Sequence, residues 1–389
     1  MRFGSQRRRE SRTSGRNTMK TFHCDHCGHL LFFENTTCVQ CGRQVAFLPD
    51  VEQMGSLDPA GEGTWRSPLP ATAGRTYRLC RNYTDQQVCN WAVPAPDSRP
   101  LCVSCRLTHV IPDLSQGGHR QAWYRLEVAK RRVIFRMMRL GLPFFNREDD
   151  PQRGLVFEFK TGPPDGTETV LTGHANGVIT INVAEADDVE RERQRKAFHE
   201  PHRSLLGHMR HEIGHYYWDR LIAQSAEITE FRKLFGDERL DYRAALKTHY
   251  EQGPFSDWPD HFISAYASAH PWEDWAETWA YYLHIVDALE TAAACGMSLH
   301  PQRADEPSMS AVPPTVSLGQ LPFRSLIDRW FPLSYTLNNL NRGLGLPDAY
   351  SCVLSAPAIA KLEYLHEAIS RSDRSNEDSR EATNRHSAA

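Results

Sequence analysis

The chain has 389 residues, of which 40% are hydrophobic and 24% charged, and its formal net charge is −3. This composition is ordinary for a globular protein, and the length allows two or three domains. Because the net charge is close to zero, the chain has no overall electrostatic attraction to nucleic acid or to an anionic membrane. No apolar stretch reaches the roughly 18 residues of a membrane span, so we expect no membrane association.

The first 20 residues are basic and polar and contain no apolar core. They therefore do not look like a secretory signal, and the absence of such a signal favours a cytoplasmic location. We predict a disordered basic tail over residues 1–20. Either Met1 or Met19 can be the true start, because ordered-looking sequence begins just after Met19.

Eight of the ten cysteines precede residue 106, and they fall into two groups of four. The first group consists of two Cys-x-x-Cys pairs, namely Cys24, Cys27, Cys38 and Cys41. Two such turns close a tetrahedral zinc site, and in a chain without a signal peptide this spacing indicates metal rather than disulfides. We predict a zinc ribbon over residues 21–50 that is folded around a structural zinc ion.

The second group consists of Cys80, Cys89, Cys102 and Cys105. Only its second half has the regular Cys-x-x-Cys spacing, so the resemblance to a ribbon is looser. We predict a second four-cysteine module over residues 76–113 with its own structural zinc. Between the two modules, residues 51–75 are rich in Pro, Gly and Ser and predict a linker.

Several arginines accompany the second cysteine group, and zinc ribbons often bind nucleic acid or protein. The arginines are Arg75, Arg78, Arg81, Arg99 and Arg106. A basic surface with aromatic residues could hold a single strand by stacking and phosphate contacts. Scattered solvated charge is the more ordinary interpretation, so a nucleic-acid or protein partner of the ribbons stays an alternative.

From residue 114 onward the pattern becomes mostly helical. Residues 119–140 predict an amphipathic helix, 155–160 and 177–184 predict strands, and 318–369 predict a final helical block. We therefore expect an α+β fold, with a mostly helical domain over residues 114–369 and a small sheet. The polar residues 370–389 predict a disordered tail.

The sequence His-Glu-x-x-His occurs at His211, Glu212 and His215, within a predicted helix over residues 201–223. The two histidines lie one turn apart and off the apolar stripe, so both can reach one zinc ion. Glu212 is then placed to take a proton from a zinc-activated water. Three fixed positions also recur by chance, and a third ligand is needed to support the interpretation.

The best source of a third ligand is a predicted helix over residues 271–293. Its acidic face carries Glu273 and Glu277, opposite a face rich in tryptophan. A solvated acidic face is common on any helix. Here the tryptophans indicate that the helix is packed against the core.

These motifs together resemble the gluzincin branch of zinc metallopeptidases, and the segment from Tyr266 to Glu277 resembles the active-site segment of lethal-factor-type proteases. The resemblance implies that Glu273 is the third ligand of a catalytic zinc, that Glu277 orients a ligand histidine, and that Tyr266 donates a hydrogen bond to the developing oxyanion. Residues 20–369 are also similar to a bacterial family of zinc-binding metallopeptidases. The implied fold is zincin-like.

The resemblance further implies that a strand over residues 177–183 is the sheet edge that binds an extended peptide. We thus expect one catalytic and two structural zinc ions, with a peptide or protein as substrate. Two alternatives remain open from the sequence. One is a binding module whose zincin domain is catalytically silent, and the other is a hydrolase that acts on a bond other than a peptide bond.

Overall fold

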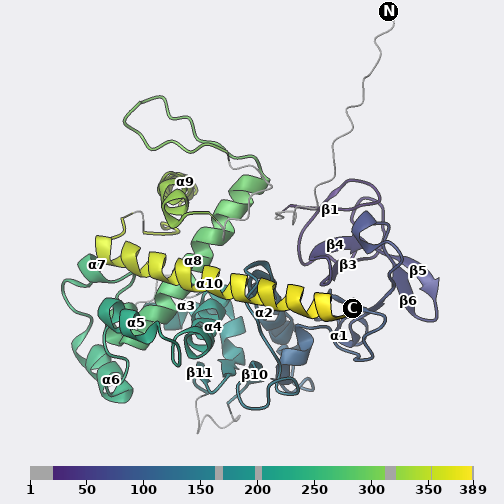
Figure 1. Ribbon diagram of the computed structural model, residues 1–389, viewed down its shortest axis with the longest axis horizontal. Helices are drawn as coiled ribbons and strands as arrows, with labels where there is room; N and C mark the ends of the chain where they lie inside the picture. Colours follow the sequence, from purple (N-terminus) through teal and green to yellow (C-terminus); the bar gives the residue numbers. More distant parts are fainter. Residues whose placement is uncertain (1–20, 163–169, 198–203, 312–320, 352, 388–389) are drawn as a thin grey trace, which may run out of the picture.

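The computed structural model describes residues 21–162, 170–197, 204–311, 321–351 and 353–387 (Figure 1). The fold is α+β, as predicted, with small sheets and a mainly helical region after residue 119. The predicted basic tail lies outside the described residues. Within the described part of the chain, no helix is long and apolar enough to cross a membrane.

The cysteine-rich region consists of short antiparallel strands gathered at one end of the molecule (Figure 1). Strands β1 and β2 pair with each other, as do β3 and β4, and β5 to β8 form a four-stranded sheet. Their bounds are Phe22–His23, Leu30–Leu31, Val45–Leu48, Gln53–Ser56, Asp58–Gly61, Thr64–Arg66, Tyr77–Leu79 and Ala92–Pro94. Short helices α1 (Arg81–Thr84), η1 (Pro70–Thr72) and η2 (Cys105–Leu107) complete the region.

The prediction of a linker over residues 51–75 is wrong, because β4, β5 and β6 lie within it. Its glycines form tight turns instead of flexible chain. Glu62 and Gly63 join β5 to β6 with φ values of 51° and 72°, the left-handed conformation that a two-residue hairpin turn requires. The two cysteine modules are therefore parts of one continuous structure.

A second four-stranded sheet has the order β11–β12–β10–β9. Its strands are β9 (Thr108–Val110), β10 (Val156–Lys160), β11 (Gly173–Ala175) and β12 (Val178–Asn182). The predictions of strands near 155–160 and 177–184 are confirmed. Strand β9 follows η2 directly and pairs in parallel with β10, so the second cysteine module supplies the outer strand on that side of the sheet.

The sheet also corrects the predicted edge strand. Strand β12 lies between β10, which runs parallel to it, and β11, which runs antiparallel. The outer strand on this side is therefore β11, and residues 177–183 are not the edge. The sequence did not indicate β11, because three residues are too short to show an alternating pattern.

Helix α2 (His119–Arg139) joins the cysteine-rich region to the rest of the chain. Its Phe135 packs against Phe22, Phe33 and Phe47, with ring centroids 6.3, 5.2 and 5.5 Å away. The Arg131 guanidinium is buried and donates a hydrogen bond of 2.5 Å to the carbonyl of Val88. The helix also packs against α4, so one apolar core runs from the ribbons to the helical region.

The remaining helices follow in chain order. They are η3 (Val183–Ala186), α3 (Asp188–Ala197), α4 (Leu205–Leu221), α5 (Ile228–Phe235), α6 (Tyr242–Gln252), α7 (Trp258–His261), η4 (Tyr266–Ala269), α8 (Pro271–Ala294), α9 (Phe323–Gly343) and α10 (Ala356–Ser387). Helix α10 extends across the molecule in Figure 1. It contradicts the predicted disordered tail, since the backbone stays helical through a polar run without Pro or Gly.

Helices α4 and α8 make the largest contact between any two elements of the described chain. The Tyr217 and Trp279 rings stack with centroids 4.9 Å apart, and the Trp275 indole donates a 2.9 Å hydrogen bond to the carbonyl of Gly214. A Cβ atom on Gly214 would lie 3.1 Å from Trp279 Cβ and 3.2 Å from the Cα of Ala276. Glycine at this position therefore permits the close approach of the two helices.

Candidate metal centres

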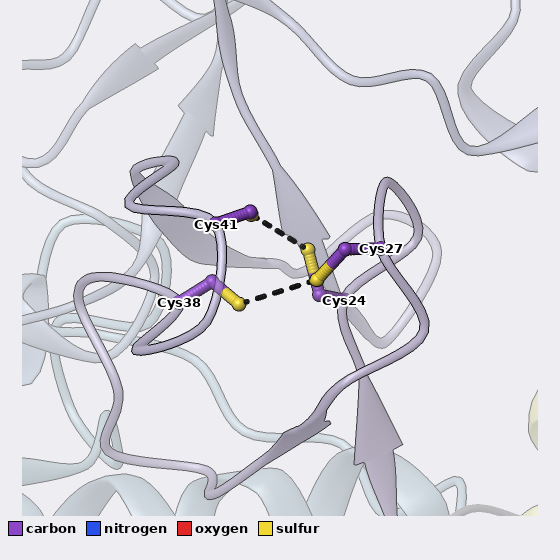
Figure 2. Close-up of side chains that lie close together, drawn as sticks. All are labelled: Cys24, Cys27, Cys38 and Cys41. Atoms are coloured by element: carbon purple, nitrogen blue, oxygen red, sulfur yellow. Dashed lines mark hydrogen bonds between the residues drawn. The ribbon is translucent and has the colours of Figure 1, made fainter.

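The four sulfur atoms of Cys24, Cys27, Cys38 and Cys41 all lie within 4.8 Å of one another. Two loops bring them together from opposite sides, as Figure 2 shows. The Sγ atoms of Cys24 and Cys41 are 3.8 Å apart and those of Cys27 and Cys38 are 3.6 Å apart. These separations are far longer than the ~2.05 Å of a disulfide bond, and they suit thiolates around one zinc ion.

The second group, Cys80, Cys89, Cys102 and Cys105, is equally compact and wholly buried. Backbone N–H groups of Cys102 and Cys105 point at Cys80 Sγ and Cys102 Sγ, at 3.3 and 3.4 Å. Such donors favour the thiolate form that binds metal. Both groups are closed four-sulfur sets with no position for a substrate, so each fits a structural zinc ion.

Helix α4 carries the His-Glu-x-x-His motif. Its N-cap is Ser204, whose hydroxyl accepts a hydrogen bond of 3.0 Å from the N–H of Gly207. The predicted start near Pro201 lies outside the described residues. Residues 209–218 are all buried, so the helix has no solvated face, and the histidines face other protein elements instead.

The N-terminal turn of α8 brings Glu273 to the two histidines. His270 is the N-cap, and its Nδ1 accepts a 3.1 Å hydrogen bond from the N–H of Trp272. His211 Nε2 lies 2.9 Å from Glu273 Oε2 and 3.2 Å from His215 Nε2. His215 Nε2 lies 3.6 Å from Glu273 Oε1. We call these three residues the His–Glu centre.

The donor atoms of the His–Glu centre fit a metal ion. Glu273 Oε2 is buried and has no hydrogen-bond partner among the described residues, although it lies 2.9 Å from His211 Nε2. His211 Nε2 and Glu273 Oε2 therefore lie close together without a hydrogen bond between them, as two ligand atoms of one metal ion do. Two imidazoles and one carboxylate are also a set that zinc prefers when a fourth position is kept open.

The electrostatics of the His–Glu centre favour a cation. Burial opposes a charge on His211, but the neighbouring carboxylates of Glu273 and Glu277 raise its pKa well above the usual value. Burial likewise opposes the Glu273 carboxylate, but the charges of His215 and His211 hold its pKa well below the usual value. A proton and a metal ion would therefore compete for these atoms.

Glu277 holds the other side of the His211 ring. Its Oε1 lies 2.7 Å from His211 Nδ1, and its Oε2 accepts a 2.7 Å hydrogen bond from the Ser264 hydroxyl. A carboxylate at this position fixes the tautomer of a ligand histidine, so that Nε2 carries the lone pair. No equivalent contact is found for His215, whose Nδ1 has no hydrogen-bond partner in the described part of the chain.

Glu212, the glutamate of the motif, lies beside the His–Glu centre and is held by one oxygen only. Its Oε1 is 3.1 Å from His208 Nε2, and His208 Nδ1 is 2.6 Å from Glu185 Oε2. Its Oε2 is buried without a hydrogen-bond partner among the described residues. Burial opposes the charge of Glu212, but the hydrogen bond from His208 lowers its pKa, so the side chain is an anion at neutral pH.

Comparison with known proteins agrees with this geometry. Residues 119–368 match the model of a family described as "Putative zinc-binding metallo-peptidase", and residues 21–116 match that of a zinc-ribbon domain. The chain belongs to this metallo-peptidase family. An uncharacterized protein of Mycobacterium bovis and one of Mycobacterium tuberculosis are each 42% identical to it over 352 residues, which cover 90% of this chain and 95% of the relative. No solved structure matches the chain.

The structure places Tyr266 next to the His–Glu centre of this family member. Its ring centroid lies 5.9 Å from that of His211 and 5.8 Å from that of His249 on α6. A second tyrosine, which the sequence did not indicate, contacts a ligand residue directly. The Tyr242 hydroxyl donates a 2.7 Å hydrogen bond to Glu273 Oε1. Burial and the Glu273 carboxylate raise the pKa of this phenol, so it stays protonated.

His174 on β11 is another neighbour that the sequence did not indicate. Its ring lies parallel to that of His215 at 6.3 Å, and its side chain is only 1% exposed. Burial lowers the pKa of His174 to about 4, so it is neutral at physiological pH. Asp219 lies 4.0 Å from His174 Nε2 and makes no hydrogen bond with His215 in the described residues.

Proposed function

We propose that the chain is a zinc-dependent peptidase that hydrolyses peptide bonds at the His–Glu centre, with Glu212 as the general base. One observation carries the proposal: ligand atoms of His211, His215 and Glu273 lie within 4.8 Å of one another, and Glu212, the next residue to His211 on α4, is close enough for the charges of both histidines to lower its pKa. Membership of a zinc-binding metallo-peptidase family supports the reaction class. The two four-cysteine sites would hold structural zinc ions.

A zinc ion held by His211, His215 and Glu273 would supply Lewis-acid activation of a carbonyl and of a water molecule. The rest of the reaction falls to side chains. Glu212 Oε2 takes a proton from the attacking water and delivers it to the leaving amine, while His208 keeps Oε1 in place. Tyr266 donates a hydrogen bond to the developing oxyanion. Glu277 keeps the His211 ring in the tautomer that binds metal.

We further propose that β11 is the strand to which an extended substrate adds. It is the outer strand of its sheet, and it packs against α4. His174 is partly exposed as a residue although its side chain is 1% exposed, so its main chain provides the open surface. Among the described residues β11 is an edge with an exposed main chain, and such an edge next to a hydrolytic centre suits a peptide better than a small molecule.

The direct test is the variant Glu212→Gln, assayed by mass spectrometry on a library of unstructured peptides. We expect it to keep the wild-type zinc content and to lose hydrolysis by a factor of at least about 100. Glu363→Gln, which changes an exposed carboxylate on α10, is the matched control and should cleave as wild type does. An unchanged rate in Glu212→Gln would contradict the proposed role.

The same library separates a peptidase from a hydrolase of another bond. The zinc-loaded protein could leave every peptide intact but hydrolyse simple ester or amide substrates in a Glu212-dependent way. That result would contradict a peptide as substrate and support Glu212 as the general base of a hydrolase. If neither class of substrate is cleaved, the result favours the alternative that the chain is a binding module whose zincin domain is catalytically silent.

The binding-module alternative has less support from the ribbon surface. Arg75 pairs with Asp50, and Arg99 and Arg106 both pair with Asp97. Arg78 donates to the carbonyl of Asp97. These guanidinium groups are already engaged by the chain itself, which reduces their value for phosphate contacts. A mobility shift with single-stranded nucleic acid that weakens with salt would favour this alternative.

A further inference from the structure

The two oxygens of Glu273 have different surroundings. Oε1 accepts the 2.7 Å hydrogen bond from the Tyr242 hydroxyl, whereas Oε2 has no hydrogen-bond partner among the described residues. Oε2 is also the nearer oxygen to His211 Nε2, at 2.9 Å. Thus Tyr242 holds Oε1 by a hydrogen bond, and Oε2 is the oxygen left to bind an ion in the His–Glu centre.

We propose that Tyr242 is a positioning residue of the metal centre: its hydroxyl holds Glu273 Oε1, so that the carboxylate binds the ion through Oε2 alone. This proposal rests on the proposed metal centre and goes beyond it, because it assigns the coordination mode of Glu273 to a residue on another helix. Without the phenol, Oε1 would be free to turn toward the ion as well, since it lies 3.6 Å from His215 Nε2. A second carboxylate oxygen would then take the position that water and substrate need.

Tyr242 reaches Glu273 from a helix that is otherwise weakly anchored. Helix α6 contains no fully buried residue and begins with Asp241 as its N-cap, which accepts a 3.1 Å hydrogen bond from the N–H of Ala244. The Tyr242 ring is held edge-on by His270 at 5.2 Å and Trp272 at 6.0 Å. These ring contacts place the hydroxyl at Oε1 and do not depend on it.

The ring contacts make Tyr242→Phe a clean test, because phenylalanine keeps the packing and removes only the hydroxyl. The variant, the wild type, Glu273→Gln and the control Tyr335→Phe are first loaded with Zn²⁺, and the labile ion is then removed with a mild chelator that leaves the four-cysteine sites filled. Tyr335 lies 49% exposed on α9, so its phenol is a matched control away from the centre.

Two measurements follow on each protein, and neither requires substrate turnover. The affinity of the emptied centre for Zn²⁺ is measured by competition with a chromophoric chelator. The centre is then refilled with Co²⁺, whose ligand-field absorption weakens when the coordination number rises from four to five. For Tyr242→Phe we expect an affinity about 10-fold lower, as for other partners of metal ligands. We also expect weaker Co²⁺ bands, while Tyr335→Phe matches the wild type in both.

The outcomes separate this proposal from the one on which it rests. If Glu273→Gln binds the labile Zn²⁺ as tightly as the wild type, the metal centre itself is wrong and the role of Tyr242 falls with it. If Glu273→Gln loses the ion but Tyr242→Phe keeps either the wild-type affinity or the wild-type Co²⁺ spectrum, the centre stands and the positioning role is refuted.

Discussion

The two four-cysteine sites and the His–Glu centre differ in how the chain assembles them. Each four-cysteine site is made by loops close together in sequence, and in the second site backbone N–H groups point at the sulfur atoms. The His–Glu centre joins two helices, α4 and α8, that are far apart in sequence. Its donor atoms are held in place by other side chains, namely Glu277 on His211 and Tyr242 on Glu273.

This difference indicates which part of the protein depends on bound metal for its folded structure. The strands around the cysteines are two to four residues long, and the two four-cysteine sites join the loops between them, so bound zinc would supply much of their stability. The helices around the His–Glu centre are packed by large buried rings such as Trp275, Trp279 and Tyr217. We expect these helices to stay folded when the zinc ion of the His–Glu centre is removed.

The largest expected effect tests this directly by removing one ligand from each kind of site. Cys102→Ser should lose one zinc ion and most of the ~10 kcal/mol that such a site contributes, and the cysteine-rich region should unfold. Glu273→Gln should also lose one zinc ion, but its free energy of unfolding should change by less than about 2 kcal/mol. Metal analysis and chemical denaturation followed by circular dichroism measure both effects. Equal destabilisation by the two variants would contradict the comparison.

A smaller effect is expected where α4 meets α8. In Gly214→Ala the new methyl group would lie 3.1 Å from Trp279 Cβ and 3.2 Å from the Cα of Ala276, where neither atom can move alone. We expect a loss of about 1–3 kcal/mol in stability, as for other overpacked cores. Because the helices must separate slightly, Zn²⁺ affinity at the His–Glu centre should fall while the four-cysteine sites stay filled. Gly173→Ala, which has open space around its Cα, is the control.

The sequence predicted well what depends on local pattern. The Cys-x-x-Cys spacing indicated both sulfur sites, and helical periodicity indicated α2 and α8 nearly to their ends. The predicted linker was wrong because Gly and Pro are also typical of tight turns between paired strands. The predicted C-terminal tail was wrong because polar composition alone does not exclude a helix.

The residues that surround the His–Glu centre could not be predicted in the same way. Tyr242, His174 and Glu185 lie on three different elements, and each approaches the centre only through the tertiary fold. None of them stands at a fixed spacing from His211 or Glu273 that a motif could express. Glu273, Glu277 and Tyr266 were named through a resemblance. The structure brings Glu273 to the two histidines, Glu277 Oε1 to 2.7 Å from His211 Nδ1 and the Tyr266 ring to 5.9 Å from the His211 ring, and the roles implied for these residues stay predictions.

His208 offers a test of how much the residues that surround the His–Glu centre contribute to the reaction. In His208→Leu, Glu212 loses the donor at its Oε1 and Glu185 loses its imidazole partner. We expect peptide hydrolysis to fall at least about 10-fold with zinc content unchanged, because Glu212 would no longer be held in place for the proton transfer. His208→Gln, which can still donate to Glu212, should recover part of the rate. His300→Gln, at an exposed position, should not affect it.

The smallest effect concerns a charge pair that joins the cysteine-rich region to α2. Arg132 donates a 2.7 Å hydrogen bond to Glu34, and the two side chains are 48% and 24% exposed. Because water screens both groups, a double-mutant cycle of Arg132→Ala and Glu34→Ala should give a coupling of no more than about 1 kcal/mol. By contrast, Phe135→Ala, which removes the ring packed on Phe22, Phe33 and Phe47, should cost about 3–5 kcal/mol. A pair coupling as large as the loss in Phe135→Ala would mean that charge, and not the aromatic cluster, joins the two regions.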